Sequence, residues 1–184
     1  MKKIIGVLLV AIMILTLGAC KPKDPVVEKG PVVENEVIDP SPKTESKEVT
    51  LYFANNEYVE TGDESIEKMG FEKRIVEYGD ISLEESIVRE LMNGPEDTEK
   101  FYTGIPSSAK LIGVEVAEGT AFVNFAREGM FGGSLQETFT IFQIVGSLLE
   151  LDSVDRVQFL IDGKKDESLM GHYSIEEAFE EISN

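Results

Sequence analysis

The chain has 184 residues, with 17 lysines and arginines against 35 aspartates and glutamates, so its formal net charge at pH 7 is −18. Residues Glu48–Asn184 alone carry −19, which argues against nucleic acid and anionic lipid headgroups as direct partners, since both are bound through basic patches. The single cysteine excludes an internal disulfide, but the roughly 137 residues from Glu48 onward can form one domain with its own core.

The N-terminus has the composition of a secretory signal peptide, with a charged start at Met1–Lys3 and an uncharged apolar run at Ile4–Leu17. The run is shorter than the roughly 20 apolar residues that a membrane-spanning helix needs. The tetrapeptide Leu17-Gly18-Ala19-Cys20 resembles the bacterial lipobox, which implies cleavage before Cys20 and a diacylglyceryl thioether on its sulfur. We therefore expect residues 1–19 to be a lipoprotein signal peptide.

The alternative is an ordinary signal peptide, or a short anchor, in which Cys20 is incidental. Acylation is favoured because Cys20 lies at the processing site and the chain has no second cysteine to pair with it. Each buried methylene contributes about 0.8 kcal/mol, so two or more acyl chains, palmitate among them, give stable attachment. The sequence thus predicts that Cys20 anchors the protein in the lipid bilayer, on the extracytoplasmic face of the cell membrane.

Residues 20–47 are predicted to be the acylated N-terminus and a disordered tether. Lys21–Lys47 contains five of the seven prolines, no aromatic residue and no helical or strand periodicity. So little apolar surface does not offset the conformational entropy lost on folding, and proline favours extended geometry. A tether of this length spans roughly 30 Å as a coil and up to about 80 Å when stretched. The domain at 48–184 can therefore stand off the membrane.

The domain opens with two predicted strands and a helix. Apolar and polar residues alternate over Val49–Phe53, and Lys73–Tyr78 can form a second, shorter strand. The residues Ser82-Leu83-Glu84-Glu85 match a capping box, and the apolar positions that follow recur at helical spacing. Gly94-Pro95 is a typical helix stop, so we expect an amphipathic helix between these two signals.

A hairpin and a second helix follow. Apolar residues alternate over Ile112–Val116 and again over Ala121–Phe125, with Glu118-Gly119 as the turn. A second capping box, Ser134–Glu137, precedes an apolar arc so broad that the helix should be buried in the core. The alternative is that part of this arc meets a partner chain.

A last strand is predicted over Val157–Ile161 and a short C-terminal helix from a third capping box at Ser174–Glu177, docked on the core. The resulting order, β-α-β-β-α-β, is the split βαβ pattern. It predicts the α+β class, with one small sheet and helices on one of its faces.

Several short pieces of the domain recur in a fixed order between Val49 and His172. They are Val49–Phe53, Arg74, Glu85–Leu91 with Asn93-Gly94-Pro95, Ile105-Pro106, the strand that contains Gly119, Ala121, Val123 and Asn124, the helix of Glu137, and Val157–Gly163. In this order and spacing the segment resembles the GerMN domain, a module of sporulation and spore-germination proteins that is common in bacterial envelope lipoproteins.

The resemblance implies a noncatalytic interaction or assembly module outside the membrane, similar in topology to the ring-building motifs of sporulation and secretion complexes. It implies a protein partner or self-association, no cofactor, and structural roles for the matched positions. Two features depart from the family. Asn124 stands where the family commonly has aspartate, and the chain has one copy of the domain where the germination protein that names the family has two.

No catalytic or metal site is expected from the remaining residues. His172 is the only histidine and lies in a predicted surface turn, without partners for zinc or for a Ser-His-Asp triad. The glycine-rich Gly129–Ser134 lacks the lysine of a P-loop, and Asp162–Glu167 has lysines where calcium ligands would stand.

Carboxylates around the hairpin, Glu115, Glu118 and Glu128, leave glycan hydrolysis open, since it needs only two acids about 5 to 10 Å apart. The alternative function is therefore a peptidoglycan-binding or glycan-hydrolysing envelope protein. A solute-binding lipoprotein is a weaker alternative, because the domain is small for a two-lobed receptor.

Replacing Cys20 tests the predicted anchor. Without the sulfur no thioether can form, so Cys20→Ala should appear in the medium or stay in the cell as an unprocessed precursor, whereas Lys23→Ala should be retained as the wild type is. Immunoblots of membrane and medium fractions measure both. Unchanged membrane retention and unchanged migration of Cys20→Ala would contradict acylation.

Overall fold

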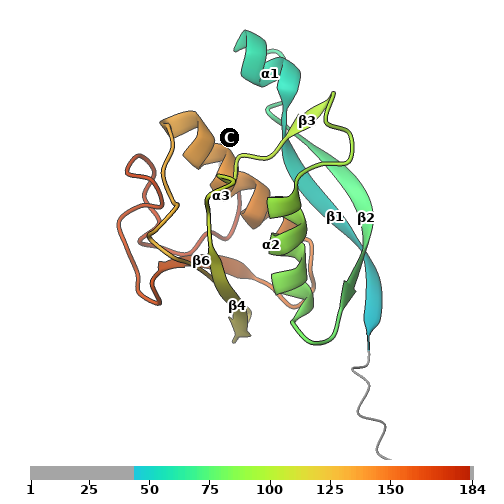
Figure 1. Cartoon of the computed structure of the whole chain (residues 1–184), viewed down its shortest axis with the longest axis vertical. Helices are drawn as coiled ribbons and strands as arrows, with labels where there is room; N and C mark the ends of the chain where they lie inside the picture. Colours follow the sequence, from blue (N-terminus) through green and yellow to red (C-terminus); the bar gives the residue numbers. More distant parts are fainter. Residues whose placement is uncertain (1–43, 183–184) are drawn as a thin grey trace, which may run out of the picture. The chain divides into compact units, whose positions relative to one another are not determined.

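The computed structural model describes residues 44–182. The predicted signal peptide, the lipobox with Cys20 and most of the predicted tether lie outside the described residues. The described elements are β1 (Glu45–Asn55), α1 (Asn56–Thr61), β2 (Met69–Tyr78), α2 (Leu83–Asn93), β3 (Phe101–Tyr102), β4 (Leu111–Ala117), β5 (Thr120–Phe125), α3 (Ser134–Leu149) and β6 (Arg156–Ile161) (Figure 1). Glu45–Lys47, which the sequence assigned to the tether, belong to β1. Within residues 44–182 no helix is long and apolar enough to cross a membrane.

The strands form two three-stranded sheets, and the predicted α+β class is confirmed. One sheet has the order β2-β1-β3 and is antiparallel throughout. In the other, with the order β4-β5-β6, β4 and β5 form the predicted antiparallel hairpin, and β5 and β6 are parallel across α3. The second half of the split βαβ pattern is thus present. The first half is not, because β1 and β2 pair with each other and not with β4–β6.

The position of α3 explains why the strands do not merge into one sheet. This helix contacts both β1 and β6 (Figure 1). Along β1 the backbone N–H of Tyr52 donates to the hydroxyl of Ser147 on α3, at 2.9 Å. A helix side chain therefore satisfies a strand edge that a further strand would otherwise use.

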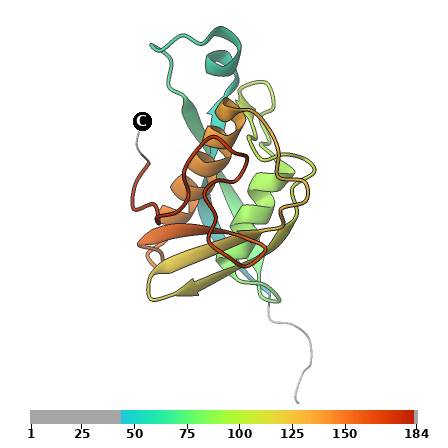
Figure 2. The ribbon, with the colours of Figure 1, turned by 90° about the vertical axis from the view of Figure 1, so that its left-hand side faces the viewer.

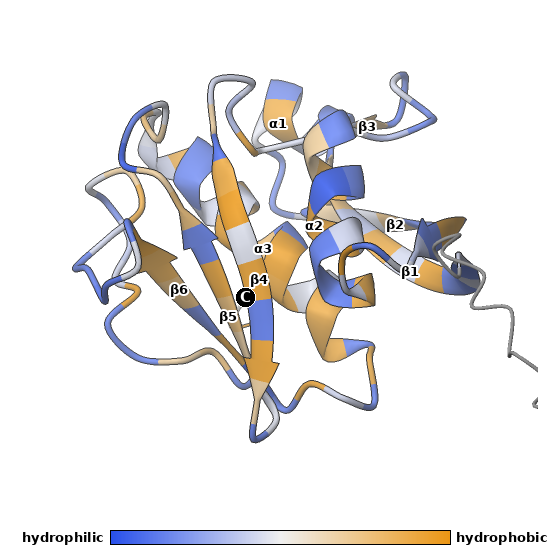
Figure 3. Ribbon diagram, turned by 60° about the horizontal axis from the view of Figure 1, so that its bottom comes forward, coloured by the Kyte–Doolittle hydropathy of each residue, from blue (hydrophilic) through white to orange (hydrophobic). Residues whose placement is uncertain are grey.

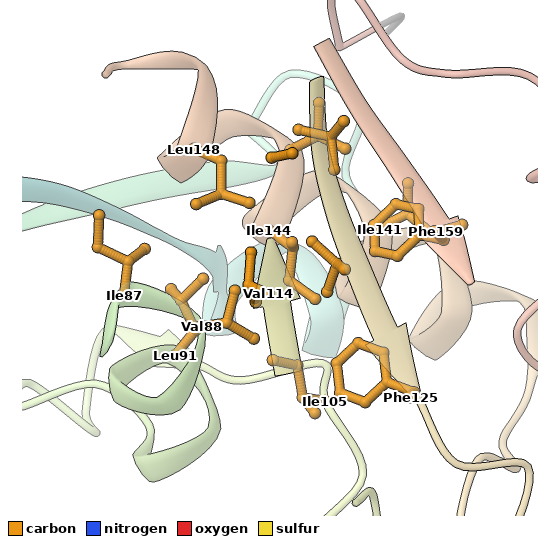
Figure 4. Close-up of a cluster of buried hydrophobic side chains, with 14 of the residues drawn as sticks. Ile87, Val88, Leu91, Ile105, Val114, Phe125, Ile141, Ile144, Leu148 and Phe159 are labelled. Atoms are coloured by element: carbon orange, nitrogen blue, oxygen red, sulfur yellow. The ribbon is translucent and has the colours of Figure 1, made fainter. Parts of the chain in front are cut away.

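The core lies around α3, whose residues Phe139–Leu148 are all buried, so the prediction of burial is confirmed. Side chains from α2, α3 and β4–β6 point toward one another in this core (Figure 4); among them are Ile87, Val88, Leu91, Val114, Phe125, Ile141, Ile144, Leu148 and Phe159. Along β4 and β5 polar and apolar residues alternate, as expected for strands with one buried face (Figure 3). Ala121 and Val123 are fully buried on the inner face of β5.

The predicted capping boxes are only partly present. Ser82 caps α2 by accepting from the N–H of Glu85 at 3.1 Å, but the Glu85 carboxylate contacts Arg89 and does not reach back to the cap. At α3 the capping box is wrong: the N-cap is Gly133, with no side-chain cap, and Ser134 is already helical. Glu137 is buried and accepts from other amides, so it is not available to the N-terminus of its own helix.

The predicted C-terminal helix is also wrong. Residues after β6 form an irregular segment that returns alongside α3 (Figure 2, dark red). Phe179 exchanges two backbone hydrogen bonds with Val157 of β6, at 2.9 and 2.8 Å, and the side chain of Gln158 donates to the carbonyl of Ile175. The edge of β6 thus takes the backbone groups that a helix would use. Ile175 and Phe179 still dock on the core, as expected.

Glu137 holds the start of this segment to α3. Its carboxylate is fully buried and accepts from the backbone N–H groups of Met170 and His172, both at 2.7 Å, and of Tyr173 at 3.2 Å. Hydrogen bonds to a charged group are worth about 1.5–3 kcal/mol each, and buried donors left without an acceptor are costly. Glu137 is therefore a structural anchor for the chain that follows β6.

Removing this carboxylate should destabilise the domain. We expect Glu137→Ala to lower the free energy of unfolding by about 3 kcal/mol and to speed hydrogen exchange at the amides of Met170 and Tyr173. Urea denaturation and hydrogen exchange of the full chain measure the two effects. The control Glu128→Ala removes an exposed carboxylate and should change neither. Equal stability of the two variants would contradict the structural role.

Candidate interaction surfaces

Arg74 ties β2 to the end of α2. Its guanidinium forms ion pairs with Glu72 at 2.8 Å and Glu90 at 2.9 Å, and donates to the carbonyl of Gly94 at 3.2 Å. The group also lies 5.9 Å from the centre of the Phe53 ring. The matched positions Arg74 and Gly94-Pro95 are thus brought together at one junction of strand and helix.

Glu72 completes this junction. Burial alone would raise the pKa of its carboxyl group, but the backbone N–H groups of Asp97 and Glu96 and the guanidinium of Arg74 outweigh it, so the pKa lies below its usual range. For Arg74 burial likewise opposes the charge, and the carboxylates of Glu90 and Glu72 raise the pKa instead. Both groups stay ionised, which suits a structural ion pair and not proton transfer.

The other matched positions lie in turns and in the core. Gly119 has φ +72° in the hairpin turn, and its carbonyl accepts from the N–H of Asp155 at 2.7 Å; an added Cβ would overlap the Asp155 carboxylate. Pro106 is buried after the short β3. Asn124 accepts from the N–H of Gly163 through Oδ1, at 2.9 Å. An aspartate can accept the same bond, so the departure from the family at this position preserves the turn.

The polar residues considered for chemistry are dispersed. His172 is exposed, as expected, and its Nε2 lies 3.2 Å from the carbonyl oxygen of Gly132. Glu128 forms an ion pair with Lys110 at 2.9 Å, which holds the pKa of the carboxyl below its usual range, whereas the general acid of a glycosidase needs a raised pKa. Within residues 44–182 no three His, Cys, Asp or Glu side chains are grouped to hold a metal ion.

The most exposed apolar side chains lie on β2. Ile75 is 71% exposed and Phe71 is 56% exposed, on the face opposite Val76 and Arg74. The ring of Phe71 packs against Tyr52 of β1, with ring centres 5.9 Å apart. We call the row Phe71, Lys73, Ile75 and Glu77 the β2 outer row. The sequence missed its first part, because the polar residues before Gly70 concealed the strand.

Two apolar grooves lie elsewhere. The end groove, of about 380 Å³, is lined by Val59 of α1, Tyr102 of β3 and Leu135 and Phe139 of α3. The sheet groove, of about 280 Å³, lies on the outer face of β4–β6; Ile112, Phe122 and Leu160 line it, together with Glu115, Asn124 and Gly163. Nothing in the sequence marked these surfaces, since each combines residues that are distant along the chain.

Residues 50–167 match the family model Germane, described as sporulation and spore germination. The chain belongs to this family. The resemblance to GerMN domains found in the sequence is thus confirmed, and the described part of the chain from β1 onward is a GerMN-type domain. No curated protein matches the chain.

Solved GerMN domains share this fold. The first GerMN domain of the sporulation protein GerM from Bacillus subtilis has a TM-score of 0.55 at 16% identity, covering 70% of this chain and 92% of that one. The tandem GerMN domains of the same protein give 0.53 at 17% identity, covering 79% of this chain and 48% of that one. A Clostridium perfringens protein provisionally described as a lipoprotein gives 0.48 at 18% identity, covering 73% and 87%.

The pH dependence of stability tests the Arg74–Glu72 junction of the GerMN domain. Because the pKa of Glu72 is lower in the folded state, its contribution is fully present above the unfolded value of about 4.3 and is lost as the pH falls through the folded value. Glu72→Gln should therefore be about 1–3 kcal/mol less stable than wild type at pH 7, and this difference should shrink toward pH 3.

Urea denaturation of the full chain at pH 7, 5 and 3 measures this effect. Glu60→Gln, which removes an exposed carboxylate from α1, is the control and should follow the wild type at each pH. A Glu72→Gln variant as stable as wild type at pH 7 would mean that the junction contributes nothing to the fold.

Proposed function

We propose that this protein is a lipoprotein held by acylated Cys20 on the extracytoplasmic face of the cell membrane, where its GerMN domain binds another protein, or itself, in envelope assembly during sporulation or germination. The observation that carries the proposal is the contrast on the domain surface. Apolar side chains stay exposed on β2 and in two grooves, on a domain that is otherwise strongly acidic. Exposed apolar surface of this kind is typical of binding sites for proteins.

A noncatalytic role is favoured by where the buried and half-buried charged groups point. Arg74, Glu72 and Glu90 bind one another, and the Glu137 carboxylate accepts three backbone amides. These groups connect elements of the fold and do not line either apolar groove. The grooves offer apolar contact, with Glu115 as the one charged side chain, which suits binding better than turnover.

The cellular setting is proposed from the N-terminus and from the family. The lipobox predicts the anchor, and the proline-rich tether would let the domain reach partners above the bilayer. The description of the family and the sporulation protein GerM of Bacillus subtilis support a role in sporulation or germination.

Photo-cross-linking in sporulating cells tests the binding role. A photoreactive residue at Leu135 of the end groove or at Ile112 of the sheet groove, in the full-length protein, should form adducts with an envelope protein. The same residue at exposed Lys164 is the control and should form few. Absence of adducts at both groove positions would overturn the proposal that these surfaces bind a protein.

Incubation with purified cell wall tests the alternative of glycan binding or hydrolysis. The proposal expects the full-length protein to stay in the supernatant and to release no sugar. Sedimentation without sugar release would replace the protein partner with peptidoglycan. Release of sugars would overturn the noncatalytic role.

A further inference from the structure

The strand β2 has the one long sheet edge among the described residues that no other element covers. At β1 the hydroxyl of Ser147 accepts from the sheet edge, and at β6 the backbone of Phe179 pairs with the strand. At β4 the carboxylate of Glu85 lies 3.4 Å from the N–H of Val114. β2, in contrast, is the outermost strand of its sheet (Figure 1).

β2 also lacks the features that usually protect an edge. Proteins block exposed edges with short strands, prolines or bulges. This strand runs over ten residues, Met69–Tyr78, contains no proline, and pairs with β1 without a register shift. Its outer row holds the most exposed apolar side chain of the described residues, Ile75. Such an edge is a template for one more strand.

We propose that β2 pairs edge to edge with β2 of a second copy of this chain, antiparallel, about a two-fold axis at Ile75. This inference rests on the proposed binding role of the domain and names self-association as one form of it. The two sheets then continue through the pair of β2 strands. The interface is the same on both copies, as closed two-fold symmetry requires.

The side chains of β2 select this register. In a symmetric antiparallel pair the axis passes through one residue, and residues at equal distances on either side of it face each other. With the axis at Ile75, Ile75 faces Ile75 of the second copy, and Lys73 faces Glu77 of the second copy, twice by symmetry. Opposite charges and apolar pairs directly across two strands are stabilising.

The neighbouring registers are worse. An axis at Lys73 places two lysines opposite each other, which is destabilising. An axis at Arg74 places Phe71 opposite Glu77 and Ile75 opposite Lys73, so that each apolar side chain meets a charge. The complementarity of the β2 outer row is thus to itself, which is the reason for choosing a second copy over an unrelated strand.

The strong negative charge of the domain does not prevent this contact. Two domains at −19 repel each other, but at physiological ionic strength the Debye length is about 8 Å, so most of this repulsion is screened. Anchoring of both copies in one membrane would also raise their effective concentration. We therefore expect the dimer on membranes and not in dilute solution.

Disulfide trapping tests the axis. In an antiparallel pair, directly opposite Cα atoms lie about 4.5–5.5 Å apart, within the range of a disulfide. We expect Ile75→Cys, in the full-length protein on membranes under mild oxidation, to give a covalent dimer on non-reducing gels. The unmodified chain, with Cys20 alone, sets the background.

Phe71→Cys is the matched control, since it lies on the same strand and face and is also exposed. Its symmetry mate would be about 26 Å away along the strands, so its dimer yield should be at least ten-fold lower than that of Ile75→Cys. Equal yields would mean random collision. No dimer above background from Ile75→Cys would overturn the proposal, as it would if another strand occupied the edge.

A charge swap tests the register independently. In the Ile75→Cys chain, Lys73→Glu puts like charges opposite each other twice and should lower the dimer yield about ten-fold. Adding Glu77→Lys should restore it. The control Glu48→Gln removes the partner that Lys73 has within its own chain, at 3.5 Å, and should leave the yield unchanged. Failure of the double variant to recover would overturn this register.

The outcomes separate this inference from the proposed function. Adducts at Leu135 or Ile112 without an Ile75→Cys dimer would overturn the β2 pairing and leave the binding role in place. A specific dimer without adducts would limit binding to self-association. Neither result would mean that both proposals are wrong.

Discussion

The fold depends on α3 being buried on nearly every side while it still satisfies polar groups of its neighbours. Three of its buried residues have this second task. Ser147 accepts from β1, Gln143 accepts from the N–H of Gly104 at 2.7 Å, and Thr140 donates to the carbonyl of Gly104 at 2.8 Å. Buried backbone groups without partners are costly, so these side chains let a helix take the place of a strand beside β1. The gap between the two sheets follows from this arrangement.

The same economy governs the remaining polar residues. Arg74 joins β2 to α2, Glu137 joins α3 to the segment after β6, and Asn124 joins β5 to the turn at Gly163. Because the polar side chains hold the elements together, the surface that is left for partners is apolar or simply acidic. A binding module is therefore what this distribution of side chains favours.

Local patterns predicted the elements whose structure is decided locally. The alternation over Val49–Phe53 and the hairpin turn at Gly119 were sufficient, since side chains in a strand alternate between buried and exposed faces. The helical spacing of Ile175, Phe179 and Ile182 was misleading, because the open edge of β6 competes for the same backbone groups. Likewise the sequence could not reveal that the carboxylate of Glu137 faces amides more than thirty residues away. The grooves could not be predicted either, since they join residues of α1, β3 and α3 that only the tertiary fold brings together.

The first residues of β1 connect the predicted tether directly to the longest pair of strands in the domain. Glu45 is already paired with Tyr78, and the pairing continues without interruption to Ala54 and Met69. Hydrogen bonds of an antiparallel ladder run perpendicular to its strands. Tension transmitted from a membrane anchor along β1 would therefore load these bonds together in shear, and not one after another as in unzipping. The domain enters its tether in the geometry best able to resist pulling, as a protein must if it bridges a membrane and a large assembly that move relative to each other.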